Sequence, residues 1–459
     1  SSESRPGSGS PFSSVEGRQS FPALEEKILR FWQDERVFEK SLSPIDEKTG
    51  QSRPMFVFYE GPPTANGKPG IHHVLARAFK DVIPRFKTMR GYYVPRKAGW
   101  DCHGLPVEVE VEKRLGLTGK KQIEELGIAE FNRRCRESVF QYIKDWDRLT
   151  DRIGFWVDTE HPYRTLDNDY IESCWALLRQ LWDRGLLTKD YKVTKHCPRC
   201  GTSLAEAEAG QGMKDDVEDP SVFVRLTLTP GQTLPFAGGP TTDTPTSVLI
   251  WTTTPWTLPA NAAAALSPKG EYALVADPKQ PGARIILLSS QAQAILGDKK
   301  TTVEVLGTAG GAALSGLRYQ PLYPGVGPGG AAIDLSAAYR LICDDTVELG
   351  EGSGIVHIAP AYGDLDVGRR HGLPVLFSIG SDGIVLPAFP QFAGKFFKEA
   401  DPIITRDLKD RGLLLSSGRI KHSYPFCWRC DTPLLYLAKE SWYIRTTAVR
   451  DQLLEQNGR

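Results

Sequence analysis

Four of the eight cysteines in this 459-residue sequence form two Cys-x-x-Cys pairs. Two such pairs suit a tetrahedral structural zinc ion, because each pair can chelate from one turn while backbone N–H groups stabilise the charge on sulfur. Residues 201–426 separate the pairs, so one ion would join two chain ends at the root of an inserted domain. The alternatives are unpaired thiols or two half sites, and redox catalysis is disfavoured because neither pair opens a thioredoxin-like βαβ unit. The predicted ligands are Cys197, Cys200, Cys427 and Cys430.

A second chemical pattern is the loop Gly61–Gly70, which is rich in glycine and proline and leads into His72 and His73. The run Met55–Tyr59 before it is apolar and aromatic, as expected of a parallel strand buried on both faces, and residues 74–79 have helical spacing. The histidines should therefore lie in the first turn of a helix, where free N–H groups and the helix dipole favour an anion such as phosphate. The stretch contains neither a P-loop motif nor Gly-x-Gly-x-x-Gly. A tight turn with solvent-facing histidines is the alternative.

Asp101 lies in a second glycine-bounded loop, Gly99–Glu108, which we expect to lie beside the first loop. A carboxylate held between a tryptophan and two glycines can receive an ammonium group, because a charge-assisted hydrogen bond in a partly dehydrated loop is strong and directional. The alternative is an aspartate that caps a helix N-terminus.

Two further stretches carry polar side chains that could act on a substrate. Thr252, Thr253 and Thr254 line up hydroxyl groups at the end of a predicted strand, and His357 and Asp366 lie on either side of a glycine- and proline-rich turn. These groups can hold an ammonium and orient a hydrolytic water, but they do not form a nucleophilic triad. The alternative for the threonine run is an ordinary strand.

The elements that position these residues fall into two kinds. Gln122–Ile153 and Tyr170–Leu187 have the periodicity of amphipathic helices, and with the first strand they predict the first half of a doubly wound, Rossmann-like α/β nucleotide-binding domain. From about Ser203 short β-prone runs alternate with Gly, Pro and Asp, which predicts an inserted, mostly antiparallel β-barrel. The predicted divisions are a disordered tail over 1–20, the α/β half over 21–196, the insertion over 197–430, and a return to the α/β domain over 431–459.

Composition narrows the class of protein. Fifty-six basic and 56 acidic residues cancel, so any nucleic acid must be bound by a local patch, and DNA-coating proteins are disfavoured. We expect no membrane span, because no run of about 18 apolar residues occurs. Two Cys-x-x-Cys pairs beside isolated cysteines favour a reducing compartment, hence the cytoplasm, and we expect a monomer.

Several motifs together resemble class I isoleucyl-tRNA synthetases. They are Gly-Pro-Pro-Thr-Ala-Asn-Gly from Gly61, Gly-Trp-Asp-Cys-His-Gly-Leu-Pro-Val-Glu from Gly99, Trp-Thr-Thr-Thr-Pro-Trp-Thr-Leu-Pro-Ala-Asn from Trp251, Gly-Ile-Val-His-Ile-Ala-Pro-Ala from Gly354, and Glu-Ser-Trp-Tyr from Glu440. The second motif is closer to the isoleucine branch than to the leucine or valine branches. The resemblance covers the chain from Phe21 onward.

The resemblance implies an ATP- and Mg²⁺-dependent ligase that joins isoleucine to tRNA-Ile through an aminoacyl-adenylate. It implies that Gly61, Pro62 and Asp101 form the aminoacyl pocket, with Asp101 receiving the ammonium, and that Gly70, His72 and His73 handle ATP phosphates. It further implies an editing site for valyl-tRNA in the barrel, made by Thr252, Thr253, Thr254, His357 and Asp366, with Asp366 on the ammonium. Editing is needed because valine lacks only one methylene, which a hydrophobic pocket discriminates weakly, a limit for which this family is the usual example.

Two departures from the family pattern affect these expectations. The family's His-x-Gly-His signature reads Gly-Ile-His-His at residues 70–73, and no Lys-Met-Ser-Lys-Ser loop occurs. We therefore expect a fragment of a longer synthetase that does not activate isoleucine by itself. A free-standing aminoacyl-tRNA hydrolase and a zinc-stabilised RNA-binding module are the rival interpretations.

Overall fold

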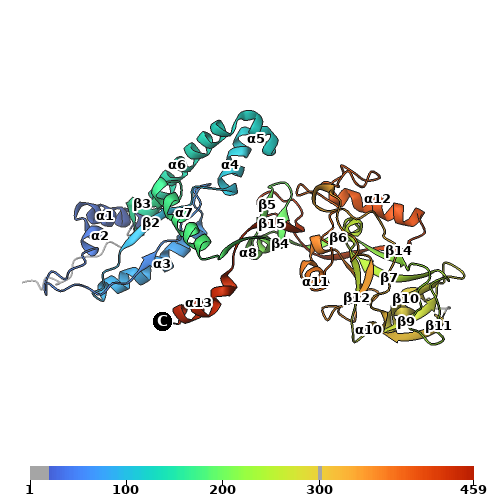
Figure 1. Ribbon diagram of the computed structural model, residues 1–459. Helices are drawn as coiled ribbons and strands as arrows, with labels where there is room; N and C mark the ends of the chain where they lie inside the picture. The colour runs from blue at the N-terminus through green and yellow to red at the C-terminus, as the bar shows by residue number, and fades with distance from the viewer. Residues whose placement is uncertain (1–19, 298–301, 459) are drawn as a thin grey trace, which may run out of the picture. The chain divides into compact units, whose positions relative to one another are not determined.

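The computed structural model describes residues 20–297 and 302–458, so the predicted tail lies outside the described residues except for Ser20. The chain divides into two compact units, Ser1–Gln180 and Leu181–Arg459, which are treated separately below (Figure 1). The domain limits expected from the sequence stay a prediction. Within the described residues, none of the helices combines the length and apolar character needed to cross a membrane.

The first unit is built on a three-stranded parallel sheet in the order β1-β2-β3. Its strands are β1 (Phe58–Tyr59), β2 (Arg96–Trp100) and β3 (Asp158–Arg164). The connection from β1 to β2 is α3 (Ile71–Met89), and the connection from β2 to β3 contains α4 (Leu105–Leu115), α5 (Lys120–Leu126) and α6 (Ile128–Arg152). The predicted succession of strand, loop and helix is therefore confirmed, as is the α/β class of this unit.

The prediction that Met55–Tyr59 forms a strand buried on both faces is wrong. Only Phe58 and Tyr59 are in β1, and the side chain of Tyr59 is 84% exposed. The physical reason is position in the sheet, because β1 is an edge strand with β2 as its one described neighbour.

The long predicted helix over Gln122–Ile153 is interrupted at Gly127, where a φ of 100° ends α5 and starts α6. Past that break, apolar residues three or four positions apart put one face of α6 into the core of the unit, against Trp100. The remaining helices before residue 184 are α1 (Phe21–Asp34), α2 (Val37–Ser41) and α7 (Asn168–Asp183).

The second unit contains a nine-stranded mixed sheet within the described residues. Its strands are β6 (Met213–Thr227), β7 (Thr246–Thr252), β8 (Ala263–Leu266), β9 (Glu271–Ala276), β10 (Arg284–Leu288), β11 (Val305–Gly310), β12 (Arg340–Cys343), β13 (Ile355–Ile358) and β14 (Leu414–Pro425). β7 runs parallel to β10 and β13, and β8 runs parallel to β12, whereas the other described pairs are antiparallel.

A short segment without a strand of its own closes this sheet into a barrel. The neighbours β6, β7, β13, β8 and β12 form five sides of a ring. Leu317–Gln320 forms the sixth side, since bridges join Leu228 to Tyr319 and Arg318 to Arg340. The Gln320 N–H also donates to the Thr227 carbonyl at 2.8 Å. The predicted barrel is confirmed, with a mixed sheet in which antiparallel pairs predominate.

A separate antiparallel ribbon lies at the root of the barrel. β4 (Leu187–Cys197) pairs with β15 (Leu435–Ile444) from Leu187 opposite Ile444 to His196 opposite Leu435, and β5 (Thr202–Leu204) pairs with β4. The remaining helices of this unit are α8 (Glu206–Gln211), η1 (Pro255–Ala260), η2 (Ser289–Gln291), α9 (Ala292–Leu296), α10 (Gly311–Leu314), η3 (Pro328–Gly330), η4 (Pro360–Tyr362), α11 (Leu365–Arg370), α12 (Phe397–Asp410), η5 (Thr446–Val449) and α13 (Arg450–Asn457).

Candidate functional site

The four predicted zinc ligands come together at the end of the root ribbon. β4 ends at Cys197, and β15 begins a few residues after Cys430. The four Sγ atoms all lie within 4.8 Å of one another, and Cys430 Sγ is 3.5 Å from the Sγ atoms of Cys197 and Cys200. Sulfur atoms bound to one tetrahedral zinc are about 3.8 Å apart, given Zn–S bonds of about 2.3 Å. The cluster therefore fits a single ion, and the alternative of two separate half sites is excluded.

The threonine run and His357 line one cavity of about 360 Å³ in the barrel. Thr252 is the last residue of β7, and the chain then enters η1, while His357 projects from the neighbouring strand β13. The structure brings these residues together, as their motifs predicted. Other residues that line the cavity are Trp251, Thr257, Thr346, Glu348, Glu351, Ser353, Ile355, Val356, Ala359, Tyr362 and Asp364.

A continuous chain of hydrogen bonds runs along one wall of this cavity. Thr254 Oγ1 is 3.2 Å from the hydroxyls of both Thr252 and Thr257. Thr257 Oγ1 lies 3.0 Å from His357 Nε2, and His357 Nδ1 lies 2.8 Å from Asn261 Nδ2. Burial lowers the pKa of His357 to about 4, so the ring is neutral near pH 7. Thr257 and Asn261 were not among the predicted site residues, although both belong to the Trp251–Asn261 motif.

Asp366 lies in a neighbouring cavity of about 370 Å³. Its side chain is on the exposed side of α11, while Thr346, Val356 and Asp364 line both cavities. Asp364 accepts the Ala359 N–H at 2.9 Å, yet burial raises the pKa of its carboxyl group to about 6. Two carboxylates two residues apart thus face the same region, and only Asp366 was expected there.

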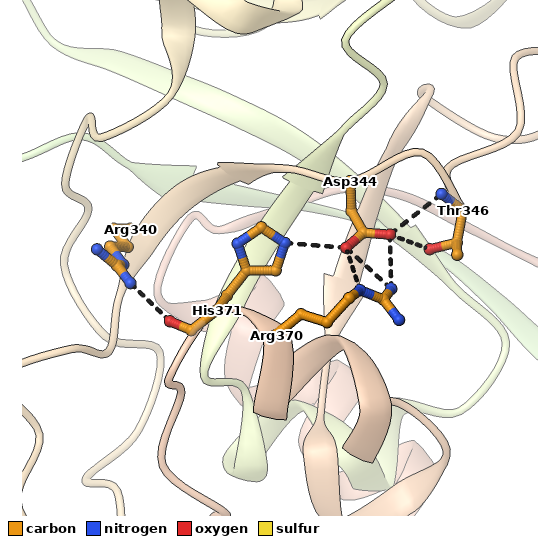
Figure 2. Close-up of polar contacts among 5 residues, drawn as sticks. All are labelled: Arg340, Asp344, Thr346, Arg370 and His371. Atoms are coloured by element: carbon orange, nitrogen blue, oxygen red, sulfur yellow. Dashed lines mark hydrogen bonds and ion pairs between the residues drawn. The ribbon is translucent and has the colours of Figure 1, made fainter.

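A buried carboxylate, Asp344, holds two residues that line these cavities, Thr346 and Arg370 (Figure 2). It accepts hydrogen bonds from the Thr346 N–H and hydroxyl, from Arg370 at 2.9 Å, and from His371 Nε2 at 2.9 Å. Although burial opposes its charge, these bonds hold the pKa of Asp344 well below its usual range. Asp344 thereby joins the end of β12 to the C-terminal end of α11, the helix that carries Asp366.

In the first unit the two glycine-bounded loops lie side by side, as expected. The Asp101 N–H donates to the Pro63 carbonyl at 3.1 Å, and the Ala65 N–H donates to the Asp101 carbonyl at 3.0 Å. Asp101 Oδ2 accepts the Thr64 hydroxyl at 3.1 Å, and its Oδ1 faces the His103 N–H at 3.3 Å. The N-cap of α4 is Gly104, so the alternative in which Asp101 caps that helix is wrong. Gly61 and Pro62 precede this contact and are exposed.

His72 and His73 lie in the first turn of α3, which begins at Ile71. His73 Nδ1 accepts the Gly70 N–H at 2.9 Å, and its ring packs edge-on against Trp146 with centroids 4.7 Å apart. Burial lowers the pKa of His73, and the nearby His72 and Arg77 add to this effect. A Cβ placed on Gly70 would lie only 2.9 Å from His72 Cε1, so the His72 ring occupies the space where a side chain at position 70 would start.

Comparison with known proteins identifies the family. Residues 27–459 match the family described as tRNA synthetases class I (I, L, M and V). The chain belongs to this family. The relatives of this class I synthetase chain include an isoleucine–tRNA ligase from Dehalococcoides mccartyi, 50% identical over 97% of the chain and 44% of the relative. Another, from Thermus thermophilus, is 47% identical over 96% of the chain and 40% of the relative.

The synthetase chain thus spans less than half the length of these curated relatives. The similarity to isoleucine–tRNA ligases that its motifs predicted is confirmed. Among solved structures, a LeuRS chain from Agrobacterium radiobacter K84, described as in a ternary complex with tRNA and LeuAMS, aligns with a TM-score of 0.34. The identity is 16%, over 92% of this chain and 55% of that one.

Proposed function

We propose that this synthetase chain takes part in joining isoleucine to tRNA-Ile with ATP and Mg²⁺, and that its barrel hydrolyses wrongly charged valyl-tRNA. The observation that carries the proposal is the 50% identity with a relative named isoleucine–tRNA ligase over 97% of the chain. A cavity that lines up threonine hydroxyls beside acidic side chains supports the hydrolytic part, because such groups suit an ammonium and a water. A cytoplasmic location and a monomeric state remain predictions.

Within this proposal each unit has its own site. In the first unit Asp101, beside Gly61 and Pro62, receives the ammonium of isoleucine, and the Gly70–His73 turn contacts ATP phosphates. The support is the contact between the two loops and the position of both histidines in the first turn of α3, the end of a helix that favours an anion.

In the barrel the aminoacyl group of valyl-tRNA lies across the two neighbouring cavities. Asp366 holds its ammonium in one cavity, while Thr252, Thr253 and Thr254 face its ester bond in the other. His357 forms the wall that limits the size of the amino-acid side chain. Thr346, Val356 and Asp364 line both cavities, which supports a substrate that extends over both.

The root of the barrel binds zinc in our proposal, through Cys197, Cys200, Cys427 and Cys430. The fit of the four Sγ atoms to one tetrahedron supports this assignment. When bound, zinc would crosslink the ribbon ends, with no part in the hydrolysis.

A deacylation time course tests the editing proposal. We expect the chain to hydrolyse valyl-tRNA slowly without ATP, and isoleucyl-tRNA more slowly still. Replacing Asp366 with Ala should lower the rate with valyl-tRNA about 10- to 100-fold, the value of a lost charge-assisted hydrogen bond. His357→Ala should instead bring the hydrolysis rates of valyl-tRNA and isoleucyl-tRNA closer together, because the side-chain wall that limits size is lost while the ammonium contact is kept.

Asp410→Ala is the matched control, since Asp410 is an exposed carboxylate on α12 that lines neither cavity. This variant should hydrolyse valyl-tRNA at the rate of the unmodified chain. If Asp366→Ala does the same, the placement of the ammonium contact is wrong.

A further inference from the structure

Two buried residues behind His357 decide how its imidazole is protonated. Tyr319 lies in the ring-closing segment Leu317–Gln320, and only 2% of the residue is exposed. Its hydroxyl is 2.6 Å from Asn261 Oδ1. Asn261 follows η1 and is also buried, and it touches His357 from the side away from Thr257.

The Asn261 amide has only one orientation that satisfies its neighbours. Its Nδ2 group lies 3.0 Å from the Ala263 carbonyl, which can only accept a hydrogen bond, so the nitrogen must face that carbonyl. Oδ1 then faces Tyr319 and accepts the phenol proton. A flipped amide would set two oxygen acceptors against each other in a buried place, which is strongly unfavourable.

This orientation fixes the tautomer of the histidine. Asn261 Nδ2 is a donor with no acceptor capacity, and His357 Nδ1 is 2.8 Å away, so Nδ1 must accept and carry no proton. The proton of the neutral ring is therefore on Nε2, which donates to Thr257 Oγ1 at 3.0 Å. The Thr257 hydroxyl in turn donates to the Thr254 carbonyl at 2.8 Å.

We propose that Asn261, whose amide is oriented by the Ala263 carbonyl and supported by the Tyr319 hydroxyl, is a positioning residue that holds His357 as the Nε2–H tautomer and so prevents it from accepting a proton from the cavity. His357 then offers Thr257 a fixed N–H donor and serves as a rigid wall, and a water in the cavity must find its base elsewhere. Calling this cavity an editing site depends on the proposed function. The tautomer itself does not, because it follows from hydrogen bonds within the chain.

The test is nitrogen NMR on the full chain labelled with ¹⁵N in its histidine rings, near pH 7.5. His357→Gln assigns the His357 signals by removing them. We expect the unmodified chain to show a protonated Nε2 and an unprotonated Nδ1 for this residue. A protonated Nδ1 would overturn the proposal, and this measurement needs no variant of Asn261 or Tyr319.

Two variants test the positioning roles. Asn261→Asp replaces the donor with an acceptor of the same shape, so the proton should move to Nδ1. Tyr319→Phe removes the partner of Oδ1 but leaves the Ala263 carbonyl, so the Nε2–H tautomer should persist. Tyr323→Phe is the matched control, because the Tyr323 hydroxyl donates to Asp407 and takes no part in the hydrogen bonds that link Tyr319, Asn261 and His357. This variant should leave the tautomer of His357 unchanged.

An Nε2–H pattern that persists in Asn261→Asp, or a protonated Nδ1 in Tyr319→Phe, would contradict the way in which the amide is argued to set the tautomer. Signals from the other histidines report whether each variant has folded. Deacylation of valyl-tRNA is measured separately. If only the proposed function is wrong, the chain will not hydrolyse valyl-tRNA but the NMR spectrum will still show the Nε2–H tautomer. If only the assignment of the tautomer is wrong, the NMR spectrum will show a protonated Nδ1 while hydrolysis continues.

Discussion

Asp401 on α12 shows how a single buried carboxylate supports the cavity from behind. Its Oδ1 accepts the Trp256 N–H at 2.9 Å, at the start of η1, which carries Thr257. Burial raises the pKa of Asp401 to about 7, despite the opposing effects of the Trp256 N–H and of Lys398. The folded chain therefore binds a proton here that the unfolded chain, with an ordinary pKa of 3.8, has already released.

The proton bound at Asp401 should make the free energy of unfolding depend on pH. Between about pH 4 and pH 7 the folded state holds more protons at Asp401 than the unfolded state, so the free energy of unfolding should fall as pH rises. Each pKa unit is worth about 1.4 kcal/mol, which sets an upper limit of about 4 kcal/mol. Asp401→Asn keeps an acceptor for Trp256 and should remove this loss, so urea unfolding at pH 5 and pH 8 should differ less than in the unmodified chain.

Asp410→Asn, on the same helix, is the control for Asp401 and should keep the pH dependence of the unmodified chain. Equal pH dependence in Asp401→Asn and Asp410→Asn would show that Asp401 is ionised in the folded state well below pH 7.

The position of the His72 ring beside Gly70 leads to a second prediction, which concerns the contact with ATP phosphates. If this ring supplies the phosphate contact that the family's first histidine would give, His72→Ala in a protein of the relatives' full length should slow isoleucine-dependent pyrophosphate exchange. The expected loss is about 100-fold, typical of an electrostatic contact to a transition state. His161→Ala, at an exposed histidine on β3, should leave exchange unchanged. An undiminished rate in His72→Ala would make the rearranged motif incidental.

Among the elements of the fold, we expect the ribbon of β4 and β15 to depend most on a bound ion, because the predicted zinc ligands lie at its end. One zinc ion per chain should be found by elemental analysis, and Cys430→Ser should abolish it, because three thiolates and a hydroxyl bind zinc poorly. Cys343→Ser, at an isolated cysteine that ends β12, should keep its zinc. Metal-free protein obtained without a chelator would refute the assignment.

The elements also show what the sequence could predict. Helical spacing was enough to predict a helix over most of α6, because it depends on residues close in the chain. The four-sulfur cluster could be predicted because the spacing within each Cys-x-x-Cys pair is local and a tetrahedral zinc needs four ligands. The burial of β1 could not be predicted, since it depends on whether a strand lies on each side. The pairing of Asn261 with Tyr319, and the position of Asp364 in both cavities while Asp366 lines only one, are tertiary features that no local spacing encodes.

On the scale of the whole molecule, the first unit leaves one side of α3 uncovered in the described residues. The apolar side chains exposed there are Ile71, Leu75, Phe79, Val82, Ile83, Phe86 and Met89. Apolar stripes of this size are usually covered in stable nucleotide-binding sheets. The 459-residue chain should accordingly show no isoleucine-dependent pyrophosphate exchange while it still hydrolyses valyl-tRNA. Measurable exchange by this chain would contradict the prediction.

The closure of the barrel by Leu317–Gln320 also bears on how quickly the second unit can fold. Its sealing contacts join Thr227 to Gln320, and the root ribbon joins His196 to Leu435, so the fold depends on partners that are far apart in sequence. Contacts of this kind slow folding much more than they weaken the product, because loop entropy grows only with the logarithm of loop length. We expect the β9–β10 hairpin, whose strands are close neighbours in the chain, to form early, and the ring and ribbon to close late. During synthesis the edge of β6 would then stay open to wrong pairing until residues 317–320 have emerged, and the ring could close only after β12 has followed them.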